Sequence, residues 1–154
     1  MYKRQSLWGT KRGDAKDYGT LIHKILSEVI TKFDVSPVLE KHILQGDIDA
    51  DKKNQLEQKI AEIITHPKLK KYYSEDVTIY NEREIVYNNQ IIIPDRLVFN
   101  KKKRVTIIDY KTGVAKEEHY FQVENYARVL ESLNYSIHKK ILVYSNKSIS
   151  VEEF

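Results

Sequence analysis

The fold is decided by residues 77–113, where the runs VTIYNEREIVY (77–87) and QIIIPDRLVF (90–99) flank the dipeptide Asn88-Asn89. Asparagine tolerates positive φ, so two asparagines between apolar runs indicate a tight hairpin turn. A third run, KRVTIIDYK at 103–111, follows a short basic turn. The stretch therefore predicts a meander of three strands.

Segments with helical spacing of apolar residues lie on both sides of this meander. Three are predicted before it, at 19–33, about 36–44 and about 51–64, and one after it, at 117–133, followed by the strand KILVY at 140–144. This order predicts an α/β (α+β) fold with a mixed central sheet flanked by helices. We expect one domain over 1–154, with a helical part at about 19–72 and a sheet core at about 75–154.

Composition excludes several classes of protein. The chain has 154 residues, 41% of them hydrophobic, which suits one globular domain. The formal net charge of +4 allows contact with a polyanion without implying it. The absence of cysteine rules out a zinc finger, a cysteine nucleophile and an iron–sulfur cluster, and it fits a reducing cytoplasm. No apolar run is long enough to span a membrane, and the basic stretch 1–19 lacks the apolar core of a signal peptide.

The predicted strand register brings acidic residues together. If the basic turn centres on Lys102, Asp95 faces Asp109, and if Asn88-Asn89 is a two-residue turn, Glu82 faces Asp95, with opposed Cβ atoms about 5 Å apart. Lys111 shares a face with Asp109 because side chains in a strand repeat with period 2. A slip of one residue in either hairpin would send the acids to opposite faces. A solvated strand end carrying a surface ion pair is the alternative interpretation of the Asp109–Lys111 piece.

Three opposed carboxylates repel one another and therefore favour a divalent cation. Oxygen ligands suit Mg²⁺ or Mn²⁺ better than zinc. A lysine beside such an ion can orient water or stabilise negative charge on a phosphate. The pattern is therefore typical of phosphodiester hydrolysis.

These residues resemble the PD-(D/E)xK nuclease superfamily, with Pro94-Asp95 as the PD and Asp109-Tyr110-Lys111 as the (D/E)xK. They are most similar to the RecB-like branch at the C-terminus of bacterial helicase–nucleases of the UvrD/AddA type. That branch adds a glycine and a histidine on an early helix, the sequence DYKTG, and Gln-x-x-x-Tyr on the following helix. The matching residues here are Gly19, His23, 109–113, Gln122 and Tyr126.

The resemblance implies a restriction-endonuclease-like core and a role for each matching residue. The metal would be bound by Asp95, Asp109, His23 and the backbone carbonyl of Tyr110. Without the resemblance, the residues alone would not identify His23 as a metal ligand. Glu82, which comes from the predicted register and not from the resemblance, would assist as an outer ligand or a water-orienting group. Lys111 would position or activate the attacking water and steady the charge on the phosphate. Gln122 and Tyr126 would line the active site and contact DNA or support the lysine strand. Of the other histidines, His42, His66 and His138 match no motif, and His119 stays an outside candidate because it lies close to this helix.

The resemblance also implies a context. It suggests a bacterial, cytoplasmic exonuclease acting with a helicase motor in double-strand break repair. No G-x-x-x-x-G-K-[ST] motif occurs here, so the motor would lie on another part of a larger protein or on another chain. The alternatives are a structure-specific or Cas4-like nuclease, against which the missing cysteines argue, and a catalytically silent DNA-binding or scaffold module.

Overall fold

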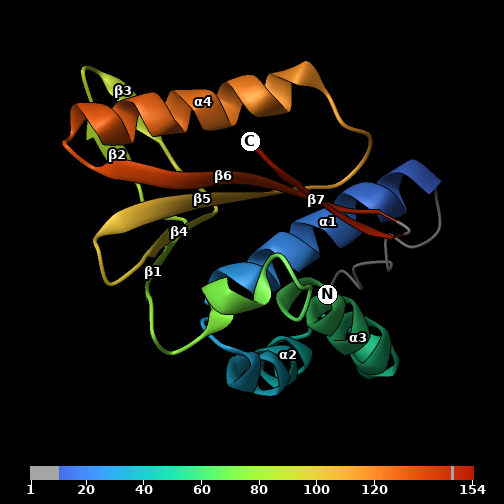
Figure 1. Cartoon of the computed structure of the whole chain (residues 1–154). Coiled ribbons are helices and arrows are strands. Elements are labelled where there is room, and N and C mark those ends of the chain that lie inside the picture. Colours follow the sequence, from blue (N-terminus) through green and yellow to red (C-terminus); the bar gives the residue numbers. More distant parts are fainter. Residues whose placement is uncertain (1–10, 147) are drawn as a thin grey trace.

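The computed structural model describes residues 11–146 and 148–154, and Figure 1 shows their arrangement. Helices α1 (Lys11–Glu28), α2 (Val35–Leu44) and α3 (Lys53–Ile64) come first, and α4 (Glu117–Ser132) lies between the strands. Short 3-10 turns span 32–34, 50–52 and 70–73. Residues 1–10 lie outside the described residues. They belong to the stretch 1–19, in which we expect no signal peptide. Within the described range, no helix has the length and apolar character needed to cross a membrane.

The strands form a mixed main sheet and a small separate one. The main sheet contains β1 (Thr78–Asn81), β4 (Arg96–Phe99), β5 (Arg104–Lys111), β6 (Ser136–Ser145) and β7 (Ile149–Glu153), in that order. Only β5 and β6 are parallel in this sheet, because α4 makes the crossover between them. The second sheet pairs β2 (Ile85–Tyr87) with β3 (Gln90–Ile92). The predicted mixed sheet flanked by helices is confirmed.

Helices cover both faces of the main sheet (Figure 1). Helix α4 packs on one face, over a cluster that includes Ile107 and Leu142. Helices α1–α3 pack on the other, over a larger cluster that includes Ile108 and Tyr110. Consecutive residues of β5 thus belong to opposite layers, as strand alternation requires. The layer of helices that each residue at the end of β5 faces therefore follows from its position in the strand.

Both predicted hairpin registers are confirmed. Asn88 and Asn89 have φ of 46° and 60°, and Ile85 pairs with Ile92 around this two-residue turn. On the other side of β4, Phe99 pairs with Val105 around the basic turn. Asn100 Oδ1 holds that turn by accepting hydrogen bonds from the N–H groups of residues 102 and 104. The register therefore brings Asp95 toward Asp109.

The prediction of three continuous strands is wrong in one respect. The first two predicted strands are interrupted at 82–84 and 93–95, which separates β1 from β2 and β3 from β4. Glu82 has φ of 47° and Pro94 has no N–H to donate to a ladder, so the regular pairing stops here. The interruptions have equal length, so Asn81 still pairs with Arg96 on one side as residue 85 pairs with 92 on the other. The break leaves the register intact, and the Glu82 N–H still donates across it to the Asp95 carbonyl.

The predicted helix 19–33 is also displaced, because helix α1 begins at Lys11, before the predicted start, and ends before the predicted end. Helix α1 ends at Glu28, because Thr31 and Asp34 form a capping box that starts a new turn. The Asp34 carboxylate accepts hydrogen bonds from the N–H groups of residues 30 and 31. Phe33, placed by spacing on the inner stripe, is 68% exposed.

Candidate active site

Two carboxylates meet where β4 begins and β5 ends. Asp95 lies immediately before β4, and its Oδ2 accepts a hydrogen bond from the Tyr110 N–H at 2.8 Å. Asp109, on β5, is 2% exposed. Burial, and then the neighbouring Asp109, raise the pKa of Asp95 to about 8. The metal-free pair therefore holds a proton at pH 7, and a cation that displaced this proton would relieve the repulsion between the two buried carboxylates.

Lys111 links this pair to α4. Its Nζ lies 2.8 Å from Asp109 Oδ2 and donates to Gln122 Oε1 at 2.6 Å. Gln122 Nε2 in turn donates to the Tyr126 hydroxyl at 2.8 Å. Burial, with Asp109 second, raises the pKa of Tyr126 to about 12, so its hydroxyl stays protonated. The two residues that the sequence placed on one helix face form a chain that holds the lysine.

His23 approaches the same region from α1. Its ring centroid lies 6.1 Å from that of Tyr110, in an edge-on arrangement. Burial lowers the pKa of His23 and outweighs the opposing effects of Asp109 and the Tyr110 backbone, so the ring is neutral at pH 7. Its Nε2 is buried and has no hydrogen-bond partner among the described residues. A neutral imidazole with an unpaired nitrogen has the protonation state of a metal ligand.

Glu82 and Gln122 are the two exposed residues among the predicted site residues. The backbone N–H of Glu82 donates to the Asp95 carbonyl at 3.0 Å, so the chain brings it opposite Asp95 as the register predicted. Its side chain is exposed, whereas Asp109 is buried. Glu82 also acts electrostatically on His23. It therefore lies at the solvent side of the site.

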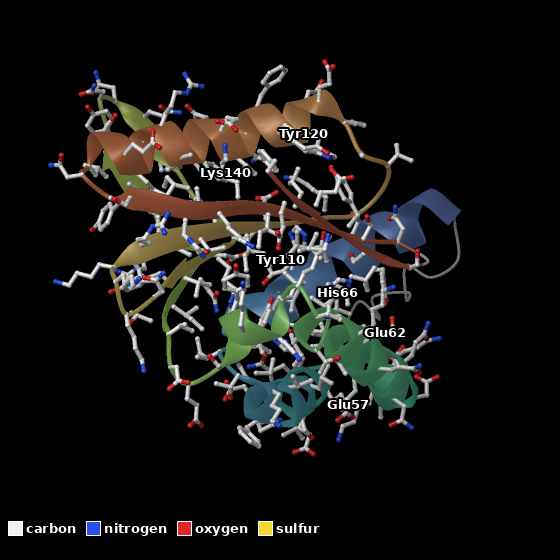
Figure 2. The ribbon with its side chains drawn as sticks, viewed as in Figure 1. Glu57, Glu62, His66, Tyr110, Tyr120 and Lys140 are labelled. Atoms are coloured by element: carbon white, nitrogen blue, oxygen red, sulfur yellow. The ribbon has the colours of Figure 1, made fainter. Side chains whose placement is uncertain are left out.

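A network behind the site was only partly expected. Arg96 follows Asp95 directly at the start of β4, and its guanidinium is fully buried. It donates to the carbonyls of residues 29, 30 and 72, and lies 3.9 Å from the Tyr73 ring centroid. The hydroxyl groups of Tyr73 and Tyr110 share a short hydrogen bond. Figure 2 shows Tyr110 on the α1–α3 side of the sheet, while Lys140 and Tyr120 lie on the α4 side.

This network joins the residues directly after α1, the helix that carries His23, to the strand that follows Asp95. Sequence reasoning missed the partnership with Tyr73. The available signal was an arginine directly after an aspartate at the start of an apolar strand, since such a cation is buried only when several acceptors meet it.

The donor atoms fit a divalent cation, although they do not form a ready-made cluster. Among residues 11–146 and 148–154, no three His, Asp or Glu side chains are arranged to hold a metal ion. The reason is local: the Lys111 ammonium lies beside Asp109 Oδ2, and the Tyr110 N–H holds Asp95 Oδ2. His23 Nε2 is nevertheless buried without a hydrogen bond from the described residues, and Asp109 Oδ2 is buried with the Lys111 ammonium as its ion-pair partner. Two carboxylates and an imidazole are suitable donors for Mg²⁺ or Mn²⁺.

Comparison with known proteins identifies the superfamily of the chain. The family model of the PD-(D/E)XK nuclease superfamily matches residues 2–148, so the chain belongs to this superfamily. Its members are mostly metal-dependent nucleases. No curated protein sequence matches the chain. Among solved structures, one titled "Crystal structure of SSO0001" is similar at 18% identity and a TM-score of 0.37, over 85% of this chain and 65% of that one.

Proposed function

We propose that this protein is a Mg²⁺- or Mn²⁺-dependent deoxyribonuclease that hydrolyses phosphodiester bonds. The observation that carries the proposal is the buried pair of Asp95 and Asp109, with Lys111 Nζ 2.8 Å from one of its oxygens. Asp95, Asp109, His23 and the Tyr110 carbonyl would hold the cation. When bound, the cation lowers the pKa of water and stabilises the charge that develops on phosphate.

The chain's own residues supply orientation and charge. Asp109 and Gln122 hold the Lys111 ammonium from two sides, which positions it to orient a water or to contact a phosphate oxygen. Tyr126 holds Gln122 in turn. Glu82, exposed beside Asp95, serves as an outer group that orients water at the solvent side.

We further propose an exonuclease of the RecB-like kind that acts with a helicase motor in bacterial double-strand break repair. Support comes from the proximity of the extra residues of that branch: His23 lies against Tyr110, and Gln122 bonds Lys111. Because the chain carries no Walker sequence, this proposal places the motor on another segment or polypeptide. A cytoplasmic location fits the absence of cysteine.

The direct test is degradation of end-labelled linear DNA, single-stranded and duplex, with a circular single strand alongside. We expect cleavage with Mg²⁺ or Mn²⁺, none with EDTA, and none by Asp109→Ala. Calcium should support DNA binding with little cleavage because its looser coordination positions water poorly. An exonuclease leaves the circle intact. Cleavage at full rate in EDTA contradicts the metal mechanism, and binding without cleavage in every metal points to a silent module.

A further inference from the structure

His119 lies on the face of α4 that carries the Lys111 support chain. It precedes Gln122 by three residues and Tyr126 by seven, so the three side chains share one face of the helix. Its ring lies beside Tyr144, with centroids 5.7 Å apart and Nδ1 2.9 Å from the hydroxyl. Tyr144 is the register partner of Lys111 across β5 and β6. His119 therefore lies beside Lys111, on the side toward the start of α4.

The hydrogen bonds of the ring define where its proton lies. The backbone N–H of Lys116 donates to Nδ1 at 3.4 Å, and an amide N–H can only donate. Nδ1 is therefore an acceptor and carries no proton. Burial, with Lys111 second, holds the pKa of His119 below its ordinary value of 6.5, so the ring is neutral at pH 7. In a neutral ring with Nδ1 unprotonated, the proton is on Nε2.

We propose that His119 contacts DNA, donating its Nε2–H to a phosphate of the strand that Lys111 engages. This inference rests on the proposed nuclease function and assigns a residue to its substrate contacts. Contacts from Lys116 and Tyr144 orient the ring, so the donor is held in place before DNA arrives. The chemical group recognised is a phosphodiester oxygen, which is read without regard to base sequence.

Two substitutions separate this role from helix capping. In His119→Asn the side-chain oxygen replaces Nδ1 as the acceptor for Lys116 and Tyr144, while the Nε2 donor is lost. In His119→Gln the longer side chain brings an N–H to the Nε2 position and loses the Nδ1 acceptor. A DNA contact therefore predicts that Gln substitutes for histidine and Asn does not, and a purely capping role predicts the reverse.

The experiment measures binding of labelled single-stranded DNA in Ca²⁺, together with kcat/KM in Mg²⁺. We expect His119→Asn to bind about 10- to 100-fold more weakly, as expected for one lost hydrogen bond to a charged group. His119→Gln should stay close to the wild type. Tyr144→Phe, which removes one partner of Nδ1 and leaves Nε2 in place, should lose far less than His119→Asn. Methylphosphonate substitution at the contacted phosphate should weaken wild-type binding and leave His119→Asn unaffected.

The outcomes distinguish the DNA contact of His119 from the nuclease function on which it rests. An active wild type with an equally active His119→Asn, or a defective Gln variant beside a normal Asn variant, overturns the DNA contact and leaves the nuclease assignment standing. A wild type that neither binds nor cleaves DNA in any divalent metal overturns the proposed function itself. Circular dichroism of each variant, compared with Tyr144→Phe, shows whether a loss comes from unfolding of α4.

Discussion

A Cβ atom placed on Gly19 would lie 2.7 Å from both γ atoms of Thr112 and 3.2 Å from its Cβ. Gly19 is one turn before His23 on α1, and Thr112 directly follows Lys111. Because real Cβ atoms essentially never approach other atoms this closely, any side chain at 19 must displace the helix or the threonine. Two motifs far apart in the sequence thus touch at their small residues, one turn before His23 and directly after Lys111.

Gly19→Ala should therefore move His23 away from the carboxylates. We expect turnover and Mn²⁺ affinity to fall about tenfold or more, with a loss of about 1–3 kcal/mol in stability from overpacking. Thr112→Ala removes both γ atoms and leaves only the 3.2 Å contact, so it should restore most of the activity in the double variant. Isothermal titration with Mn²⁺ and steady-state rates measure both effects.

Gly46→Ala is the matched control for stability alone. Gly46 follows α2 with φ of 81°, and a Cβ added there would meet no atom within 4 Å. Alanine at 46 therefore costs about 1 kcal/mol of backbone strain without touching the site. It should leave turnover unchanged. If the double variant Gly19→Ala/Thr112→Ala were no more active than Gly19→Ala, the contact with Thr112 would not be the reason for a glycine at 19.

The raised pKa of Asp95 predicts how stability depends on pH in metal-free protein. Between the ordinary value of 3.8 and about 8, the folded state binds more protons than the unfolded state, so the free energy of unfolding falls as pH rises. We expect a loss of at least about 1.4 kcal/mol between about pH 5 and pH 8, the equivalent of one pKa unit. Urea unfolding at a series of pH values measures it, and Mg²⁺ should stabilise more strongly at the higher pH.

Asp95→Asn should flatten this dependence, whereas Glu131→Gln, on an exposed part of α4, should keep it. If Asp95→Asn retained the wild-type slope, the proton bound between these pH values would belong to another group. A stability that rose with pH over this range would have the wrong sign for a buried, crowded carboxylate.

Lys111→Ala should lose most turnover while keeping metal affinity, because the lysine acts on water and phosphate. Asp109→Ala should lose both. Lys140→Ala is a matched control, since Lys140 also pairs with α4, through Glu124, but lies apart from the carboxylates. It should keep wild-type rates. A loss of metal affinity in Lys111→Ala equal to that in Asp109→Ala would make the assigned roles wrong.

Local signals in the sequence predicted the register and the proximity of the candidate acids. Asn88-Asn89 tolerates the positive φ that a two-residue turn needs, and alternation then placed the acids and Lys111. The interruption at Glu82 was not predictable in this way, because glutamate at positive φ is uncommon and carries no sequence signal. Strand β7 was missed because residues 149–153 form a short edge strand whose pairing partner, β6, decides its structure.

Buried polar networks were the other part that sequence could not predict. His42, treated as unremarkable, is fully buried, and its two ring nitrogens lie 3.0 Å from Asp47 Oδ2 and 2.9 Å from Glu28 Oε1. Arg96 is buried because three backbone carbonyls meet its guanidinium. These partners come from separate elements, so only the assembled tertiary structure reveals them.

The strand register distinguishes the two glutamates near the site. Glu82 lies opposite Asp95, whereas Glu84 lies two residues closer to the Asn88-Asn89 turn and precedes β2. Glu82→Gln should lower turnover, because an exposed carboxylate beside Asp95 is lost where water must be oriented. It should also stabilise the metal-free protein by relieving repulsion, though by less than about 1 kcal/mol because solvent screens an exposed charge. Glu84→Gln makes the same chemical change outside the site and should alter neither. Rates in Mg²⁺ and urea midpoints without metal measure both variants, and a larger loss of turnover in Glu84→Gln would place the outer carboxylate at the wrong residue.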